Sequence, residues 1–96
     1  MDKITQDFSR TLKRLRTEKN LTQEELAQRS GVDYKYFQKL EGQNPSSPTL
    51  STLNKLAKGL GLSLPELIAN IDADHKKGDS TLQVLNGRLE SDKWFF

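Results

Sequence analysis

The sequence has 96 residues, which suffice for one small domain and a short appendage but not for two separate hydrophobic cores. Hydrophobic residues make up 33 % of the chain and charged residues 29 %, so one core can form if the apolar residues gather on one face of each element. Cysteine is absent, which excludes disulfides, thiol catalysis and thiolate zinc sites, and the net charge of +2 is too small to indicate a nucleic-acid partner by itself.

Two amphipathic helices are predicted in the first thirty residues. Apolar residues recur at helical spacing through positions 4, 8, 12 and 15, which predicts a helix that ends near Asn20. Thr22 and Glu25 then have the spacing of a capping box, in which each side chain accepts a hydrogen bond from the backbone N–H of the other residue. A second helix is therefore expected to begin at Gln23 and to end before Gly31, which tolerates a left-handed backbone.

A third helix and a loop are predicted next. Asp33 can cap a helix that runs from Tyr34 to about Glu41. The proline-containing and serine-containing stretch 43–48 reads as a loop that ends with Ser47 as a cap and Pro48 in a first helical turn.

Two more helices complete an all-α arrangement of five. The fourth helix has an apolar face that we expect in the core, made by Leu50, Leu53, Leu56, Ala57 and Leu60. Ser63 and Glu66 repeat the capping-box spacing and predict the start of a fifth helix.

The chain becomes polar at Asp72, which we interpret as the start of a linker. The predicted domain therefore spans residues 1–71, and residues 72–96 are expected to form the linker and a C-terminal tail. Residues 81–90 fit either a hairpin with an Asn86-Gly87 turn or a helix. The aromatic run 94–96 favours a dimerisation or partner-binding element, with a disordered tail as the alternative.

Residues 22–42 meet the requirements of a helix-turn-helix. Two helices that cross through a tight turn need a small residue at their contact, here Ala27, and a residue that tolerates positive φ, here Gly31. The apolar residues that hold the second of these helices in place are Leu26, Val32, Phe37 and Leu40. The residues left pointing outward are Tyr34, Lys35, Gln38 and Lys39.

On these residues the sequence resembles the Cro/repressor-type (XRE) helix-turn-helix family of transcriptional regulators. The resemblance spans about residues 8–71, and it rests on Arg16, the run 22–27, Gly31-Val32, Tyr36, Leu40-Glu41-Gly42 and the segment 53–61. It implies a five-helix, lambda-repressor-like DNA-binding domain.

The resemblance also implies that the third helix enters the major groove of double-stranded operator DNA. The base contacts that it implies are Tyr34, Lys35 and Lys39, with Asp33 and Gln38 as secondary candidates. The phosphate contacts that it implies are Gln23, Tyr36, Asn44, Ser46 and Ser47. Two alternatives stay open, namely that Tyr36 covers the core and that the loop residues are solvated. Because the loop 42–48 contains no Lys or Arg, Arg10 and Lys13 are added as phosphate contacts.

Two further roles follow from the resemblance. It implies an ion pair between Arg16 and Glu41 that positions the third helix, where the alternative is two independent surface charges. It also makes Leu64, Ile68 and Ile71 candidates for a homodimer interface.

We therefore expect a sequence-specific, dimeric transcriptional regulator, with repression as its expected mode. The alternative is an antitoxin-type module that binds a protein partner through its tail and represses its own operon. His75 is the single histidine, and the sequence has no cysteine and no clustered carboxylate spacing, so we expect no metal, no cofactor and no enzymatic activity. We expect a cytoplasmic location without membrane contact, because the sequence contains neither a signal-peptide pattern nor a transmembrane run.

Overall fold

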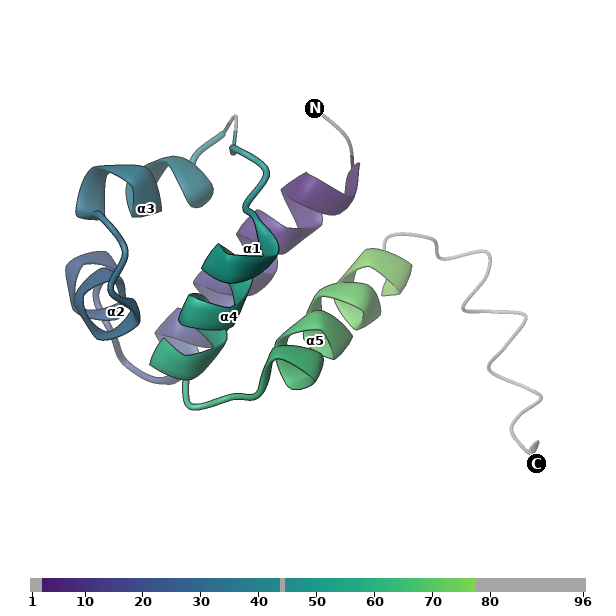
Figure 1. Cartoon of the computed structure of the whole chain (residues 1–96). Coiled ribbons are helices and arrows are strands. Elements are labelled where there is room, and N and C mark those ends of the chain that lie inside the picture. Colours follow the sequence, from purple (N-terminus) through teal and green to yellow (C-terminus); the bar gives the residue numbers. More distant parts are fainter. Residues whose placement is uncertain (1–2, 44, 78–96) are drawn as a thin grey trace.

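Five helices account for about three quarters of the described residues (Figure 1). The computed structural model describes residues 3–43 and 45–77. The helices are α1 (Lys3–Glu18), α2 (Gln23–Ser30), α3 (Tyr34–Leu40), α4 (Leu50–Gly59) and α5 (Leu64–Lys77). No strand occurs among these residues, which confirms the predicted all-α class.

Both consecutive and sequence-distant helices pack in pairs around one core. α5 packs along α1, α4 packs against α2 and α5, and α3 packs on α2, so α3 lies on the side of the molecule away from α5 (Figure 1). The buried apolar residues come from every helix: Phe8, Leu12, Leu15, Leu26, Ala27, Phe37, Leu40, Leu56, Ala57, Leu60, Leu67 and Ile71. This core fixes α3 at the surface without using its outer face.

Local sequence signals set the ends of α2 as predicted. The Thr22 hydroxyl accepts a hydrogen bond from the Glu25 backbone N–H at 3.0 Å, and the Glu25 carboxylate accepts one from the Thr22 N–H at 2.8 Å. At the other end Gly31 has a φ of 72° and closes the helix in the left-handed conformation. The capping box and the turn glycine are both confirmed.

The start of α4 differs from the prediction. Thr49, not Ser47, is the N-cap, and its hydroxyl accepts a hydrogen bond from the Thr52 N–H at 3.1 Å. The Ser47 hydroxyl instead lies 3.2 Å from the Thr5 hydroxyl on α1, so Ser47 joins the loop to the first helix. Leu50 was expected in the core, but it is the first residue of α4 and is 69 % exposed.

α5 is longer than predicted and overturns the linker boundary at Asp72. The helix continues to Lys77, and its last two turns are held on α1 by polar contacts. Thr11 donates a hydrogen bond to Asp74 at 2.6 Å, and the His75 Nδ1 atom lies 2.6 Å from an Asp7 carboxylate oxygen. His75, which the sequence pattern placed in a solvated linker, is therefore a packing residue of the domain.

Arg14 adds to this junction between α1 and α5. Its guanidinium donates to Asp74 at 3.1 Å and to the Asn70 side chain at 3.2 Å. Burial lowers the pKa of Arg14, but its bonds to Glu18 and Asp74 outweigh that effect and leave its pKa above the ordinary value. The charge of Arg14 therefore stays in place to hold α5.

Residues 81–90, predicted as a hairpin or a helix, and the aromatic run 94–96 lie outside the described residues. Within the described ranges 3–43 and 45–77, no helix has the length and apolar content needed to cross a bilayer.

Candidate nucleic-acid interface

The turn between α2 and α3 is closed by backbone contacts and a buried small residue. Ala27 is buried, and its carbonyl accepts a hydrogen bond from the Val32 N–H at 2.9 Å. Phe37 and Leu40 on α3 are fully buried against the core. The face of α3 that carries these two residues therefore points inward, and its opposite face points to solvent.

The outer face of α3 presents polar side chains. The four residues predicted to point outward are all exposed: Tyr34, Lys35, Gln38 and Lys39. They follow helical spacing on one side of the helix, and this face carries two ammonium groups and no carboxylate. Such a face offers donors for guanine, an amide for adenine and an aromatic ring for a thymine methyl.

Asp33 lies at the start of α3, and its carboxylate serves as the N-cap. The carboxylate accepts a hydrogen bond from the Tyr36 backbone N–H at 3.1 Å. This structural use was predicted, and it competes with the secondary role of Asp33 as a base contact. Tyr36 is half-buried and packs against the core, which fits the alternative that its ring covers the core.

The predicted ion pair between α1 and the end of α3 is present. Arg16 donates from Nε and Nη2 to the two Glu41 carboxylate oxygens, at 2.8 and 3.0 Å. The Glu41 side chain is only 1 % exposed, and Arg16 also donates to the Leu21 carbonyl at 2.7 Å. A two-point contact of this kind fixes both the position and the orientation of the α3 terminus.

Gln23 joins the same cluster. Its side-chain amide donates to a Glu41 carboxylate oxygen at 2.9 Å. The family resemblance implied a DNA phosphate contact for Gln23 at the amino end of α2. In this arrangement the amide is used inside the protein, so the backbone N–H of Gln23 is the group that can take that role.

A polar groove of about 400 Å³ lies where the N-terminal half of α1 faces the loop after α3. Its lining contains both predicted basic residues of α1 and three polar residues that the sequence analysis did not assign; the complete set is Gln6, Ser9, Arg10, Lys13, Glu41, Gly42, Gln43 and Pro45. The four α1 residues of this lining, at positions 6, 9, 10 and 13, share one helical face. This spacing was the signal in the sequence from which that side of the groove could have been predicted.

Two of the three loop residues that were predicted to contact phosphate lie within the described residues. Ser46 is exposed, and Ser47 is exposed but bonded to Thr5. Asn44 lies outside the described residues.

Asp7 is a buried carboxylate on α1 that the sequence pattern did not indicate. It pairs with Lys3 at 3.4 Å, with Arg10 and with His75. Burial raises the pKa of Asp7, but the hydrogen bond with His75 and the nearby charges of Lys3 and Arg10 outweigh burial and lower its pKa. The Asp7 carboxylate thereby restrains the Arg10 guanidinium, although 66 % of the Arg10 side chain stays exposed.

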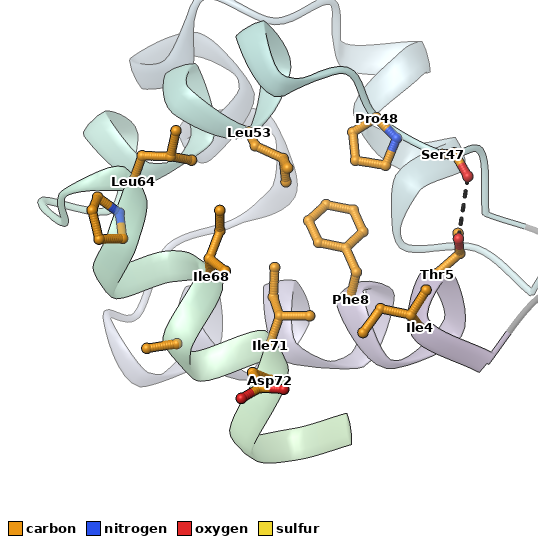
Figure 2. Close-up of a pocket in the computed structure, with 12 residues that line it drawn as sticks. Ile4, Thr5, Phe8, Ser47, Pro48, Leu53, Leu64, Ile68, Ile71 and Asp72 are labelled. Atoms are coloured by element: carbon orange, nitrogen blue, oxygen red, sulfur yellow. Dashed lines mark hydrogen bonds between the residues drawn. The ribbon is translucent and has the colours of Figure 1, made fainter. Parts of the chain in front are cut away.

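The candidate dimer residues line a second, apolar groove between α1, α4 and α5 (Figure 2). Leu64 is half-buried, Ile68 is 42 % exposed and Ile71 is 8 % exposed. The structure therefore brings the three together, with Ile68 as the accessible member and Ile71 in the core. Among the described residues, no three His, Asp or Glu side chains gather in a way that would hold a metal ion.

Comparisons with known proteins agree with this geometry. A helix-turn-helix family model matches residues 12–67. The HTH-type transcriptional regulator y4dJ of Sinorhizobium fredii, an uncharacterized protein, is 48 % identical over 59 residues, which cover 62 % of this chain and 75 % of the relative. The cryptic phage CTXphi transcriptional repressor RstR of Vibrio cholerae is 32 % identical over 87 residues, which cover 90 % of this chain and 78 % of the relative.

A solved structure is also similar. The restriction-modification controller protein C.Esp1396I, as a tetramer in complex with its natural 35 base-pair operator, superposes with a TM-score of 0.72 at 28 % identity. The match covers 78 % of this chain and 97 % of the controller protein.

Proposed function

The chain belongs to the Cro/repressor-type (XRE) helix-turn-helix family of transcriptional regulators, and on this premise we propose that it binds operator DNA as a homodimer with α3 in the major groove. The single observation that carries the proposal is the outer face of α3, exposed and free of carboxylates on a helix that Arg16 and Glu41 lock in place. A helix held in this way can present donors to base edges without first being ordered by DNA.

Sequence reading is assigned to Lys35, Lys39 and Gln38, with Tyr34 at the start of the helix. Lys can donate to guanine O6 and N7, and Gln can pair with adenine through two hydrogen bonds. Each good contact discriminates against a wrong base by about 1 to 3 kcal/mol. Asp33 is the weakest member of this set, because its carboxylate already caps α3.

Phosphate binding is assigned first to the polar groove beside the end of α3. Arg10 and Lys13 line this groove and are exposed, so they can neutralise backbone charge and release counterions. Ser46, Asn44 and Ser47 from the loop, the Gln23 N–H and the Tyr36 hydroxyl supply neutral contacts that set the register of the protein on DNA.

Dimerisation is assigned to the face of α5 that carries Leu64, Ile68 and Ile71. A two-fold dimer through this face presents two copies of α3 to successive major-groove turns, about 34 Å apart. The operator is then expected to be palindromic, because its symmetry follows that of the protein.

The related proteins are DNA-binding regulators, and we assign no catalytic role to this chain. Repression is the expected mode, as the name of the phage relative states for that protein. The antitoxin-type alternative has no specific observation in its favour. A regulator of this kind meets its operator on the chromosome or on phage DNA, so we place it in the cytoplasm.

The test is selection from a randomised duplex pool by the purified chain, followed by sequencing, with the mass in solution measured alongside. Recovery of a palindromic site by a dimer supports the proposal. Salt-sensitive binding without any recovered motif would overturn sequence-specific recognition.

A further inference from the structure

The groove between α1, α4 and α5 has a mostly apolar lining. Its volume is about 850 Å³, and Figure 2 shows Ile4 and Phe8 of α1 facing Leu53, Ile68 and Ile71 across it. Ile4 and Ile68 are 43 % and 42 % exposed, so the groove has accessible apolar walls as well as a buried floor. Covering an apolar groove of this kind with apolar side chains is favourable, because it removes apolar surface from water.

The chain itself carries such side chains directly after α5. Residues 78–96 comprise 19 residues and contain three of the seven aromatic residues of the sequence, Trp94, Phe95 and Phe96. They also contain Leu82, Val84, Leu85 and Leu89. Aromatic rings bury the largest apolar area per residue, which makes the run 94–96 the best match to the groove.

The exit of the chain from α5 lies beside the groove. His75 contacts Asp7, and Asp7 is the neighbour of Phe8 and is one helical turn from Ile4, both of which line the groove. An extended segment of 19 residues spans up to about 63 Å, whereas the 14 residues of α5 rise only about 21 Å. Residues 94–96 can therefore reach every part of the groove.

The operator-bound controller protein is shorter than this chain. It is matched over 97 % of its own length but covers only 78 % of this chain. The match therefore leaves about a fifth of this chain without a counterpart in the controller protein.

We propose that residues 78–96 dock on their own chain, with Trp94, Phe95 and Phe96 in the groove between α1, α4 and α5, and that they compete there with a second copy for Ile68. The own chain is favoured over a second copy because a tethered segment has an effective concentration in the millimolar range. The competition rests on the dimer face proposed above, whereas the docking does not. Docking would make dimerisation, and hence operator binding, depend on release of the segment.

Trp94 is the only tryptophan in the sequence, so its fluorescence reports on the docking directly. We expect a blue-shifted emission and weak quenching by acrylamide in the full chain. The Ile68→Lys variant places a charge at the exposed wall of the groove and should red-shift the emission and raise quenching severalfold. Leu50→Lys is the matched control, because Leu50 is an exposed leucine that does not line the groove, and it should leave both readouts unchanged.

A mixing experiment identifies the chain that supplies the groove. The native chain is mixed with an excess of the Trp-silent variant Ile68→Lys/Trp94→Phe, and Trp94 is expected to stay shielded because its own groove is intact. Loss of shielding in the mixture would overturn docking on the own chain and assign the groove to a partner copy. Quenching of Trp94 that is equally strong in the native chain and in Ile68→Lys would overturn docking altogether.

The competition is tested by a variant with Ser at positions 94, 95 and 96 of the full chain. If the docked form outnumbers the open form tenfold, removing the aromatic rings should strengthen dimerisation by about tenfold or more. Unchanged or weaker dimerisation would overturn the competition. Shielded Trp94 without selection of a DNA motif would instead count against the proposed function alone, so the two failures are distinguishable.

Discussion

The Arg16 guanidinium on α1 binds both oxygens of the Glu41 carboxylate at the end of α3, at 2.8 and 3.0 Å. Because Glu41 is buried and also accepts from Gln23, the three helices α1, α2 and α3 meet at one carboxylate. The orientation of the recognition helix is therefore set from two directions, by the core beneath it and by this charged contact at its end.

Loss of Arg16 should be costly. The Arg16→Leu variant leaves the Glu41 carboxylate buried without its guanidinium, which is expected to lower the free energy of unfolding by about 3 kcal/mol or more. Urea denaturation measures this change. Replacing both residues with Leu should cost less than Arg16→Leu alone, because no charge is then left buried. A loss in Arg16→Leu no larger than in Arg10→Leu, whose side chain is mostly exposed, would contradict a positioning role.

The α3 lysines and the α1 lysine should affect DNA binding differently. Lys39→Ala and Lys35→Ala are expected to weaken binding to the selected operator more than to random duplex, because base contacts discriminate by about 1 to 3 kcal/mol each. Lys13→Ala should weaken both DNAs equally and reduce the salt dependence by about one phosphate. Affinities measured over a series of salt concentrations separate these effects.

The matched control for these lysines is Lys76→Ala on α5. Lys76 is exposed and pairs only with the exposed Asp72 among the described contacts, on the side of the molecule away from α3 (Figure 1). It should change neither the operator affinity nor its salt dependence. Equal losses on operator and random DNA for Lys35→Ala and Lys39→Ala would remove both from the base-reading set.

Local signals in the sequence were sufficient for most of the fold. Thr22 with Glu25 and the left-handed Gly31 each determine one end of α2 through groups only a few residues apart, so composition and spacing carry the information. The partner of Arg16 is 25 positions away and was available only through the family resemblance. Spacing alone does not distinguish such a pair from two surface charges.

The end of α5 could not be predicted from hydropathy. After Leu67 and Ile71, the next positions on the buried face are Asp74 and His75, whose partners are the polar residues Thr11 and Asp7 on α1. A hydrophobic pattern ends where polar groups pack on polar groups, although the helix continues. The cap of α4 was misplaced for a related reason. Ser47 and Thr49 are both suitable caps, and the Ser47 hydroxyl is used in a contact with Thr5, 42 residues away in sequence.

Gly59 should be intolerant of any side chain. A Cβ atom at this position would lie 2.2 Å from the Ser30 hydroxyl oxygen and 3.1 Å from a Leu26 methyl, where α4 crosses α2. Gly59→Ala is therefore expected to destabilise the fold by about 1 to 3 kcal/mol. Gly42→Ala is the control, because the nearest atom to its Cβ would be at 3.4 Å. Thermal and urea denaturation report both changes, and equal effects would contradict the close crossing.

Ser30 itself is expected to be replaceable. Its hydroxyl is buried and has no hydrogen-bond partner among the described residues, so Ser30→Ala removes a polar group that gains nothing from burial. The variant should be neutral or more stable by about 1 kcal/mol. In this background Gly59→Ala should cost less than in the native chain, which a double-mutant cycle measures. A loss of stability in Ser30→Ala would indicate that the hydroxyl is satisfied.

Asp7 should make the stability of the α1 and α5 junction depend on acid pH. Its pKa is lowered in the folded protein, so the carboxylate contributes stability that is present above its unfolded value, about 3.8, and is lost as the pH falls through the folded pKa. Asp7→Asn should be less stable than the native chain at neutral pH, and the two should converge below that range. Asp72→Asn is the control, because Asp72 is exposed on α5, and its pH dependence should match the native chain. Urea denaturation at pH 7, 5 and 3 measures the difference in unfolding free energy between Asp7→Asn and the native chain. Only a carboxylate that takes up a proton on unfolding makes that difference vary with pH. A difference that stays constant across all three pH values would therefore contradict the assignment.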